Sequence, residues 1–446
     1  MGVWGRYLPA ALAGLGLAGP HAAFAQNAER GGLQIDLSYT EQFFYDDDDE
    51  DSETSLRSDL ELQLRSQTRT QDLSFVISGG VEKGLSDGFE FDLEDPRVAL
   101  EYSVGSRNTE LSFDASFRST EVDDLSVLDF DLATLVDDPG DREDFSTGLA
   151  LEFGREARFG TIVSLGYSET NFVNTTSSEV IDSTRFEGSV RLRFDLSRTA
   201  TGFLTTSIND LDRAEGGLDV ETRDLIGSVD VLITPGLTGA FDLGYREITR
   251  DGTRTGTSEG VTFGASLTSE RPNGTISAIL DSALEETGRR STFQVNRTLI
   301  LPRGQLSAGI GVSVNSASDS TDPLYNLSYR QALARGGFQF NFSQSFSTTS
   351  AGEETLNTTF NISADQALND ISSVSAAILF SDSDRQASTL ADTRRIRYEI
   401  DYSRQLTNRW SFVAGVAHTQ RREAGGEDSS DNEVFIGLRT ALSWRP

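Results

Sequence analysis

Residues that could carry out catalysis are rare in this chain. Its 446 residues include two histidines and no cysteine. His418 is the only histidine after the first 25 residues, and it continues an alternating series with Phe412, Ala414 and Val416. Acyl transfer needs a base beside a nucleophile, and a lone histidine on an apolar face does not supply that pair. We therefore expect a protein that is not an enzyme, with His418 at a lipid-facing rim.

The densest charge in the sequence is the acidic run at residues 46–51. Carboxylate oxygens suit Ca²⁺ and Mg²⁺, so Asp46, Asp47, Asp48 and Asp49 form a candidate cation site, although the run lacks the glycine and spacing of an EF-hand loop. Two interpretations stay open. Divalent cations at this outer loop bridge the protein to anionic lipopolysaccharide, or the run is a solvated loop that repels its neighbours. The sequence suggests no other cofactor.

A second acidic stretch, residues 121–144, is the longest connection that we expect between strands. It mixes apolar residues with Asp123, Asp124, Asp129 and Asp131. If the stretch folds into the interior, its apolar residues pack against the inner wall and these four aspartates narrow the channel, which makes them candidates for a pore constriction. The alternative is an ordinary outer loop.

Charged residues alternate with apolar residues along several other segments. On a shared face they would line a watery lumen and influence ion passage, or they would form structural pairs between neighbouring strands. Both interpretations stay open. The lumen-lining candidates are Arg57, Asp59, Glu61, Arg65, Arg191, Arg193, Asp195, Arg397, Glu399 and Asp401.

The overall charge excludes one class of partner. Asp and Glu number 70 against 38 Lys and Arg, which gives a formal net charge of −32. Binding to nucleic-acid phosphates needs clustered basic residues. We therefore expect no nucleic-acid partner.

The first 25 residues predict a signal peptide. Arg6 precedes an apolar core at residues 8–17, and Ala23 and Ala25 fit the small-residue rule for cleavage. The apolar core is too short for the roughly 20 residues of a spanning helix. The prediction is an exported protein whose mature chain, residues 26–446, forms one domain.

Alternation with a period of two dominates the chain after residue 30. Leu60, Leu62 and Leu64, for example, are separated by charged or amide residues. A period of two places the two sets on opposite faces of a strand. The expected strands are roughly 11 to 15 residues long, whereas soluble sheets commonly have strands of about 5 to 6. A tilted strand needs only about 9 to 11 residues to cross a bilayer.

The pattern predicts an all-β fold, a transmembrane up-and-down antiparallel β-barrel of about 22 strands. Leu299, Ile300 and Leu301 interrupt the alternation, so the expected range is roughly 18 to 22 strands. Short connections alternate with long acidic ones, as expected for periplasmic turns and outer loops. Trp410 and Trp444 both fall at the predicted periplasmic end, where they would form an aromatic girdle.

In this pattern the chain resembles the bacterial outer-membrane porin-type barrels, in particular the loosely defined putative β-barrel porins, some of which accompany exopolysaccharide loci. The resemblance covers residues 30–446 as a pattern rather than through motifs. The last strand, residues 434–444, resembles the aromatic-ended signal of outer-membrane proteins, although Arg445 and Pro446 follow the aromatic residue.

The resemblance implies a channel for passive passage of small hydrophilic solutes. An exopolysaccharide export barrel and a structural or adhesive barrel with acidic outer loops are the alternatives. The implied partners are outer-membrane lipid, lipopolysaccharide, the barrel-assembly machinery, and small hydrophilic solutes or polysaccharide; the oligomeric state stays open. The first expected strand begins within about ten residues of the cleavage site, which leaves no room for a plug domain and argues against a TonB-dependent receptor.

Overall fold

The computed structural model describes residues 32–48, 52–85, 92–122, 140–175, 180–214, 217–252, 255–317, 320–348, 354–385, 393–423 and 428–445. These residues form 22 β-strands and no helix, so the prediction of an all-β fold with about 22 strands is confirmed. None of the described residues belongs to an apolar helix long enough to cross a membrane. The predicted signal peptide lies outside the described residues.

The strands follow one another in chain order. They are β1 (Gly32–Asp48), β2 (Ser52–Gln67), β3 (Gln71–Gly84), β4 (Asp92–Gly105), β5 (Thr109–Glu121), β6 (Asp141–Phe153), β7 (Phe159–Val173), β8 (Ser183–Asp195), β9 (Ala200–Arg213), β10 (Asp219–Thr234), β11 (Leu237–Asp251), β12 (Gly256–Arg271), β13 (Gly274–Glu285), β14 (Gly288–Leu301), β15 (Gly304–Asn315), β16 (Ser320–Leu333), β17 (Gly336–Thr348), β18 (Glu354–Asn369), β19 (Ser372–Arg385), β20 (Thr393–Gln405), β21 (Trp410–Glu423) and β22 (Ser429–Trp444).

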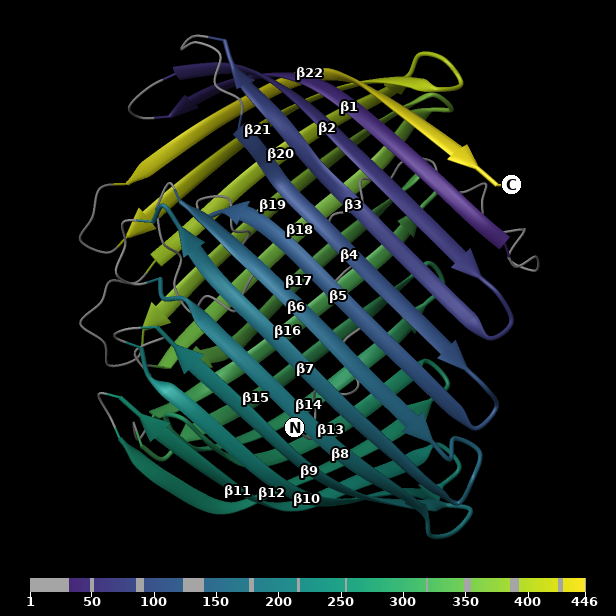
Figure 1. Cartoon of the computed structure of the whole chain (residues 1–446), viewed down its shortest axis with the longest axis vertical. Helices are drawn as coiled ribbons and strands as arrows, with labels where there is room; N and C mark the ends of the chain where they lie inside the picture. Colours follow the sequence, from purple (N-terminus) through teal and green to yellow (C-terminus); the bar gives the residue numbers. More distant parts are fainter. Residues whose placement is uncertain are drawn as a thin grey trace.

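The sheet closes on itself. Each strand pairs antiparallel with its neighbours in the sequence, and β1 also pairs with β22, from Ile35 opposite Trp444 to Asp48 opposite Asp431. Figure 1 shows the first strand lying beside the last one. At this seam the rings of Phe44 and Phe435 lie 5.5 Å apart. Closure leaves no sheet edge, which a wall in hydrocarbon requires because unpaired backbone groups there have no water to bind.

The alternation seen in the sequence becomes two chemically different faces. Large apolar side chains on one face are exposed; Leu243 is 64% and Ile310 is 61% exposed. The register places them in rows across strands, such as Leu225 opposite Tyr245 and Leu243 opposite Phe263. Polar and charged residues occupy the other face, which in a closed barrel is the inner one. The apolar face is therefore the lipid-contacting outer surface.

Several glycines on the inner wall make room for carboxylates of the neighbouring strand. Gly415 lies opposite Asp401, and Gly148 lies opposite Asp114. A Cβ atom added to Gly415 would lie 2.5 Å from Asp401 Oδ1 and 2.5 Å from the ring of Phe435. Phe435 belongs to the β1–β22 seam, so the absence of a side chain at Gly415 supports barrel closure.

We predict that Gly415→Ala lowers the thermal stability of the folded barrel, because the added methyl group displaces Phe435 at the seam. Overpacking of this kind costs about 1–3 kcal/mol. The measurement is the temperature at which the protein loses its compact migration in a detergent gel. Gly256→Ala is the matched control, since a Cβ atom there would meet nothing within 4 Å. Equal heat resistance of the two variants would contradict the prediction.

Candidate functional site

The predicted lumen-lining residues lie on the strand face opposite to the exposed apolar side chains, at alternate positions of β2, β8 and β20. The register brings none of these three groups beside another, because β2, β8 and β20 are not neighbours in the wall. Each group instead contacts partners from its own part of the barrel. Their role in solute passage stays a prediction.

Arg57 is the centre of the first group. Its Nε donates to Asp59 Oδ1 at 2.9 Å, and its Nη2 donates to Asp95 Oδ2 at 2.8 Å. A third, longer contact joins Nη1 to Glu94 Oε2 at 3.4 Å. Asp95 adopts a left-handed backbone conformation, with φ 44°. Sequence reasoning missed Glu94 and Asp95, since only the three-dimensional pairing of β3 and β4 brings them to β2.

The arginines of the second group have structural contacts. Arg193 Nη2 donates to the backbone carbonyls of Gly154, Arg155 and Ala157 at 2.8–2.9 Å, so it holds the turn between β6 and β7. Arg191 lies over the ring of Phe203 at 4.1 Å. These contacts tie both side chains to the wall.

In the third group, Arg397 Nη2 reaches Glu433 Oε2 at 3.2 Å and joins β20 to β22. Glu433 was not among the candidates. It stands on β22 directly opposite Asp46 of β1, so Arg397 connects β20 to the closing seam.

Ion pairs that the sequence did not predict lie on the inner wall, near the outer ends of the strands. Arg246 binds Asp224 through two contacts of 2.6 and 3.2 Å, and both side chains are largely buried. Arg118 and Arg142 share Asp144 at 3.1 and 2.9 Å. Alternation marks these positions as polar, but only the register between strands decides which charges meet.

The acidic run lies at the outer end of the β1–β22 seam. Asp46 lies beyond Tyr45, past the apolar band, and faces Glu433 across the seam. Partial burial, a hydrogen bond with Asp431, and repulsion from Asp431 and Glu433 raise the pKa of Asp46 to about 8.

Asp49 is outside the described residues, and no group of three or more metal-binding side chains is present in the part that the structure describes. The cation site at Asp46, Asp47, Asp48 and Asp49 therefore stays a prediction. The constriction candidates Asp123, Asp124, Asp129 and Asp131 also lie outside the described residues.

We predict that the seam loses stability as the pH rises from 5 to 9. A carboxyl group whose pKa is raised by folding stabilises the fold while it is protonated, and this contribution is lost as the pH rises through about 8. Asp46→Asn should remove much of this pH dependence and raise heat resistance at pH 9. Asp370→Asn, in the β18–β19 turn at the opposite end, is the control. An unchanged pH profile in Asp46→Asn would refute the assignment.

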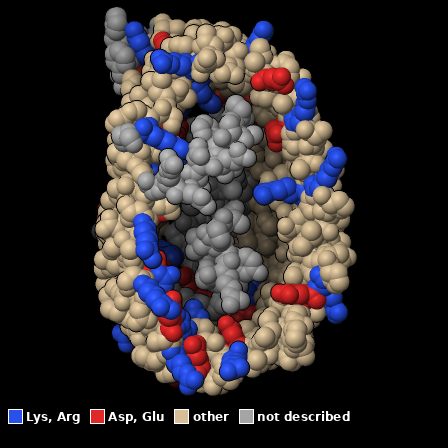
Figure 2. Space-filling view, turned by 90° about the vertical axis from the view of Figure 1, so that its right-hand side faces the viewer, with Lys and Arg blue, Asp and Glu red and all other residues tan. Residues whose placement is uncertain are grey.

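The end of the barrel with the short turns carries exposed tryptophans and arginines. Trp410 and Trp444 lie at the end with the short turns and are 41% and 57% exposed. Figure 2 looks onto that end and shows basic side chains around much of its rim. Exposed turn arginines there include Arg69, Arg198 and Arg335. The strand ends that flank the acidic stretches, at Asp48 and Glu121, lie at the other end.

His418 belongs to the outer surface. Its ring stacks on Tyr398, with centroids 6.2 Å apart, and its two nitrogens contact Asn432 and Gln420 at 2.8 and 3.0 Å. No nucleophilic side chain is among these partners. The residue is part of the rim, as its alternation with apolar residues indicated.

The closed barrel resembles solved outer-membrane receptors. No protein-family profile and no curated protein matches the sequence. Similar structures include the ferric-catecholate import receptor Fiu from E. coli K12, with a TM-score of 0.59, 9% identity, and coverage of 93% of this chain and 82% of that chain. The ferric enterobactin receptor PfeA from Pseudomonas aeruginosa gives 0.57, 10%, 93% and 81%. The FrpB iron transporter from Neisseria meningitidis gives 0.59, 8%, 93% and 82%.

These similarities define the class of protein: the chain is an outer-membrane β-barrel of the size and topology found in siderophore receptors. At this level of identity the likeness shows the fold alone. The fold agrees with the predicted location in the outer membrane.

The predicted function was wrong. The sequence favoured a porin for passive passage, but the similar structures are import receptors and an iron transporter rather than passive porins. The polysaccharide-export and adhesive alternatives have no support among them.

Proposed function

We propose that this chain forms the barrel of an outer-membrane receptor that takes up a bulky metal chelate of the siderophore class. The observation that carries the proposal is the closed 22-strand wall, which matches import receptors over 93% of the chain. The ligand class that we propose for this chain is the one that the names of those receptors give.

The inner wall supports the proposal chemically. Chelates of this class present carbonyl and other oxygen atoms, which accept hydrogen bonds from guanidinium groups. Two lumen-facing arginines near the outer end, Arg118 and Arg185, expose 37% and 45% of their side chains. Arg246 and Arg142, by contrast, are buried against carboxylates. We therefore expect Arg118 and Arg185 to contact the ligand.

The charge of the protein favours a chelate with little negative charge. A net charge of −32 creates a field that slows the approach of anions. Ferric trihydroxamates are uncharged or nearly so, whereas ferric tricatecholates carry several negative charges. We therefore propose that trihydroxamates bind more tightly than tricatecholates.

We predict saturable binding of a ferric trihydroxamate to the purified protein, measured by calorimetric titration in detergent. Arg118→Gln combined with Arg185→Gln should weaken this binding by about tenfold or more, which corresponds to about 1.4 kcal/mol. The control is Arg335→Gln, an exposed arginine in a turn at the opposite end. Added salt should strengthen binding of tricatecholates by screening the repulsion.

Two results would reject this function. One is the absence of saturable binding for hydroxamate, catecholate and carboxylate chelates alike. The other is binding that the control substitution weakens as strongly as the double substitution does. Compact migration in a detergent gel verifies that each variant is folded.

A further inference from the structure

A pair of like charges on the outer surface of β20 and β21 is not explained by the lumen or by chelate uptake. Arg394 and Arg422 stand directly opposite each other across the two strands. Like charges at directly opposite positions destabilise a sheet. Both positions share the outward face with Tyr398 and His418, which lie further down the same two strands.

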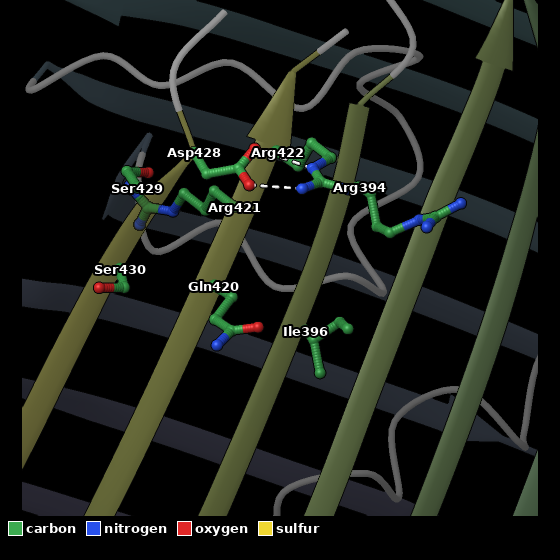
Figure 3. A pocket seen from close by; sticks show the side chains of 8 residues that line it. All are labelled: Arg394, Ile396, Gln420, Arg421, Arg422, Asp428, Ser429 and Ser430. Atoms are coloured by element: carbon green, nitrogen blue, oxygen red, sulfur yellow. Dashed lines mark hydrogen bonds and ion pairs between the residues drawn. The ribbon is translucent and has the colours of Figure 1, made fainter.

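Two acids hold these guanidinium groups apart. Arg394 Nε donates to Asp382 Oδ1 on β19 at 2.9 Å. Arg422 donates to Asp428, just before β22, through Nε at 2.8 Å and Nη2 at 2.5 Å. Figure 3 shows Arg422 and Asp428 pointing toward each other, while Arg394 extends in the other direction. Each arginine is thereby drawn away from the other, and a space remains between them.

This space is a hollow of about 380 Å³ that is open to the outside. Hydroxyl and amide groups join the basic side chains in its lining, so it offers neutral hydrogen-bond donors as well as positive charge. The lining residues are Arg394, Ile396, Gln420, Arg421, Arg422, Asp428, Ser429 and Ser430. Three of these eight residues are arginines, although acids outnumber basic residues in the whole chain.

The hollow lies at the height of lipid headgroups. The apolar pair Ile400–Val416 faces the hydrocarbon, with 53% and 45% exposure, and the Tyr398–His418 pair follows it along the strands. Arg394 and Arg422 are four residues beyond Tyr398 and His418, or about 13 Å along the strands at the usual rise per residue. Aromatic rings mark the boundary between hydrocarbon and headgroups. A group bound between the arginines therefore lies on the headgroup side of the Tyr398–His418 pair.

We propose that this hollow binds a phosphate monoester carried by a lipid of the outer leaflet. Guanidinium groups bind phosphate oxygens through two parallel hydrogen bonds, and two arginines held apart by separate acids can approach one phosphate from both sides. The outward position and the height above the aromatic pair favour a lipid over a soluble anion. The bound phosphate also offsets the repulsion between Arg394 and Arg422.

The test is native mass spectrometry of the full chain in detergent, with a lipid A that carries two phosphates and the same lipid after dephosphorylation as probes. The phosphorylated lipid should be retained by the unmodified protein and the dephosphorylated lipid should not. Arg394→Gln combined with Arg422→Gln should weaken retention by about tenfold or more. Arg422→Gln alone should have a smaller effect.

Arg223→Gln is the matched control. Arg223 has the same strand-face orientation as the exposed Leu225, has an exposed side chain and pairs with the acid Glu221. Retention that falls equally in Arg223→Gln and Arg422→Gln, or that survives the double substitution, would overturn the site. Inorganic phosphate that competes at the concentration of the lipid would overturn the lipid as its ligand. Chelate titration of the same variants separates this site from the proposed uptake function, because the hollow lies outside the lumen.

Discussion

Pairing of every backbone polar group inside the wall is the constraint on which the rest of this structure depends. A strand in hydrocarbon cannot leave its N–H and C=O groups unpaired, so the 22 strands must close, and β1 and β22 meet along almost their whole lengths. The seam combines a favourable aromatic contact with a repulsive acidic one. Phe44 and Phe435 pack there, and the acidic Asp46 and Glu433 face each other at its outer end.

Closure separates two environments that a flat sheet would not separate. Exposed apolar side chains surround the wall, and charged side chains on its inner face neutralise one another through pairs such as Arg246–Asp224. Low dielectric strengthens such pairs and makes an unpaired charge costly. Arg118 and Arg185 stay more accessible, with 37% and 45% of their side chains exposed, and are the arginines that we propose contact the ligand.

The alternating pattern predicted the strand count and both faces well, because a period of two records directly which side chains meet lipid. The uncertainty at Leu299, Ile300 and Leu301 disappears in the structure. These residues end β14 beside a short turn at the end of the barrel that carries Trp410 and Trp444, and Ile300 is 64% exposed. The same pattern did not predict the function. Alternation is shared by all such barrels, so it carried no information that separates a passive pore from a receptor.

The sequence by itself determined the all-β fold, the outward apolar face and the position of Trp410 and Trp444 at the end with the short turns, since each depends on residues near one another in the chain. Only the tertiary structure decided which charges meet. Glu94 and Asp95 approach Arg57 from another hairpin, and Arg394 stands opposite Arg422 because the register of β20 and β21 places it there. Register depends on turn geometry and on strand pairing, which the alternating pattern of the sequence does not specify.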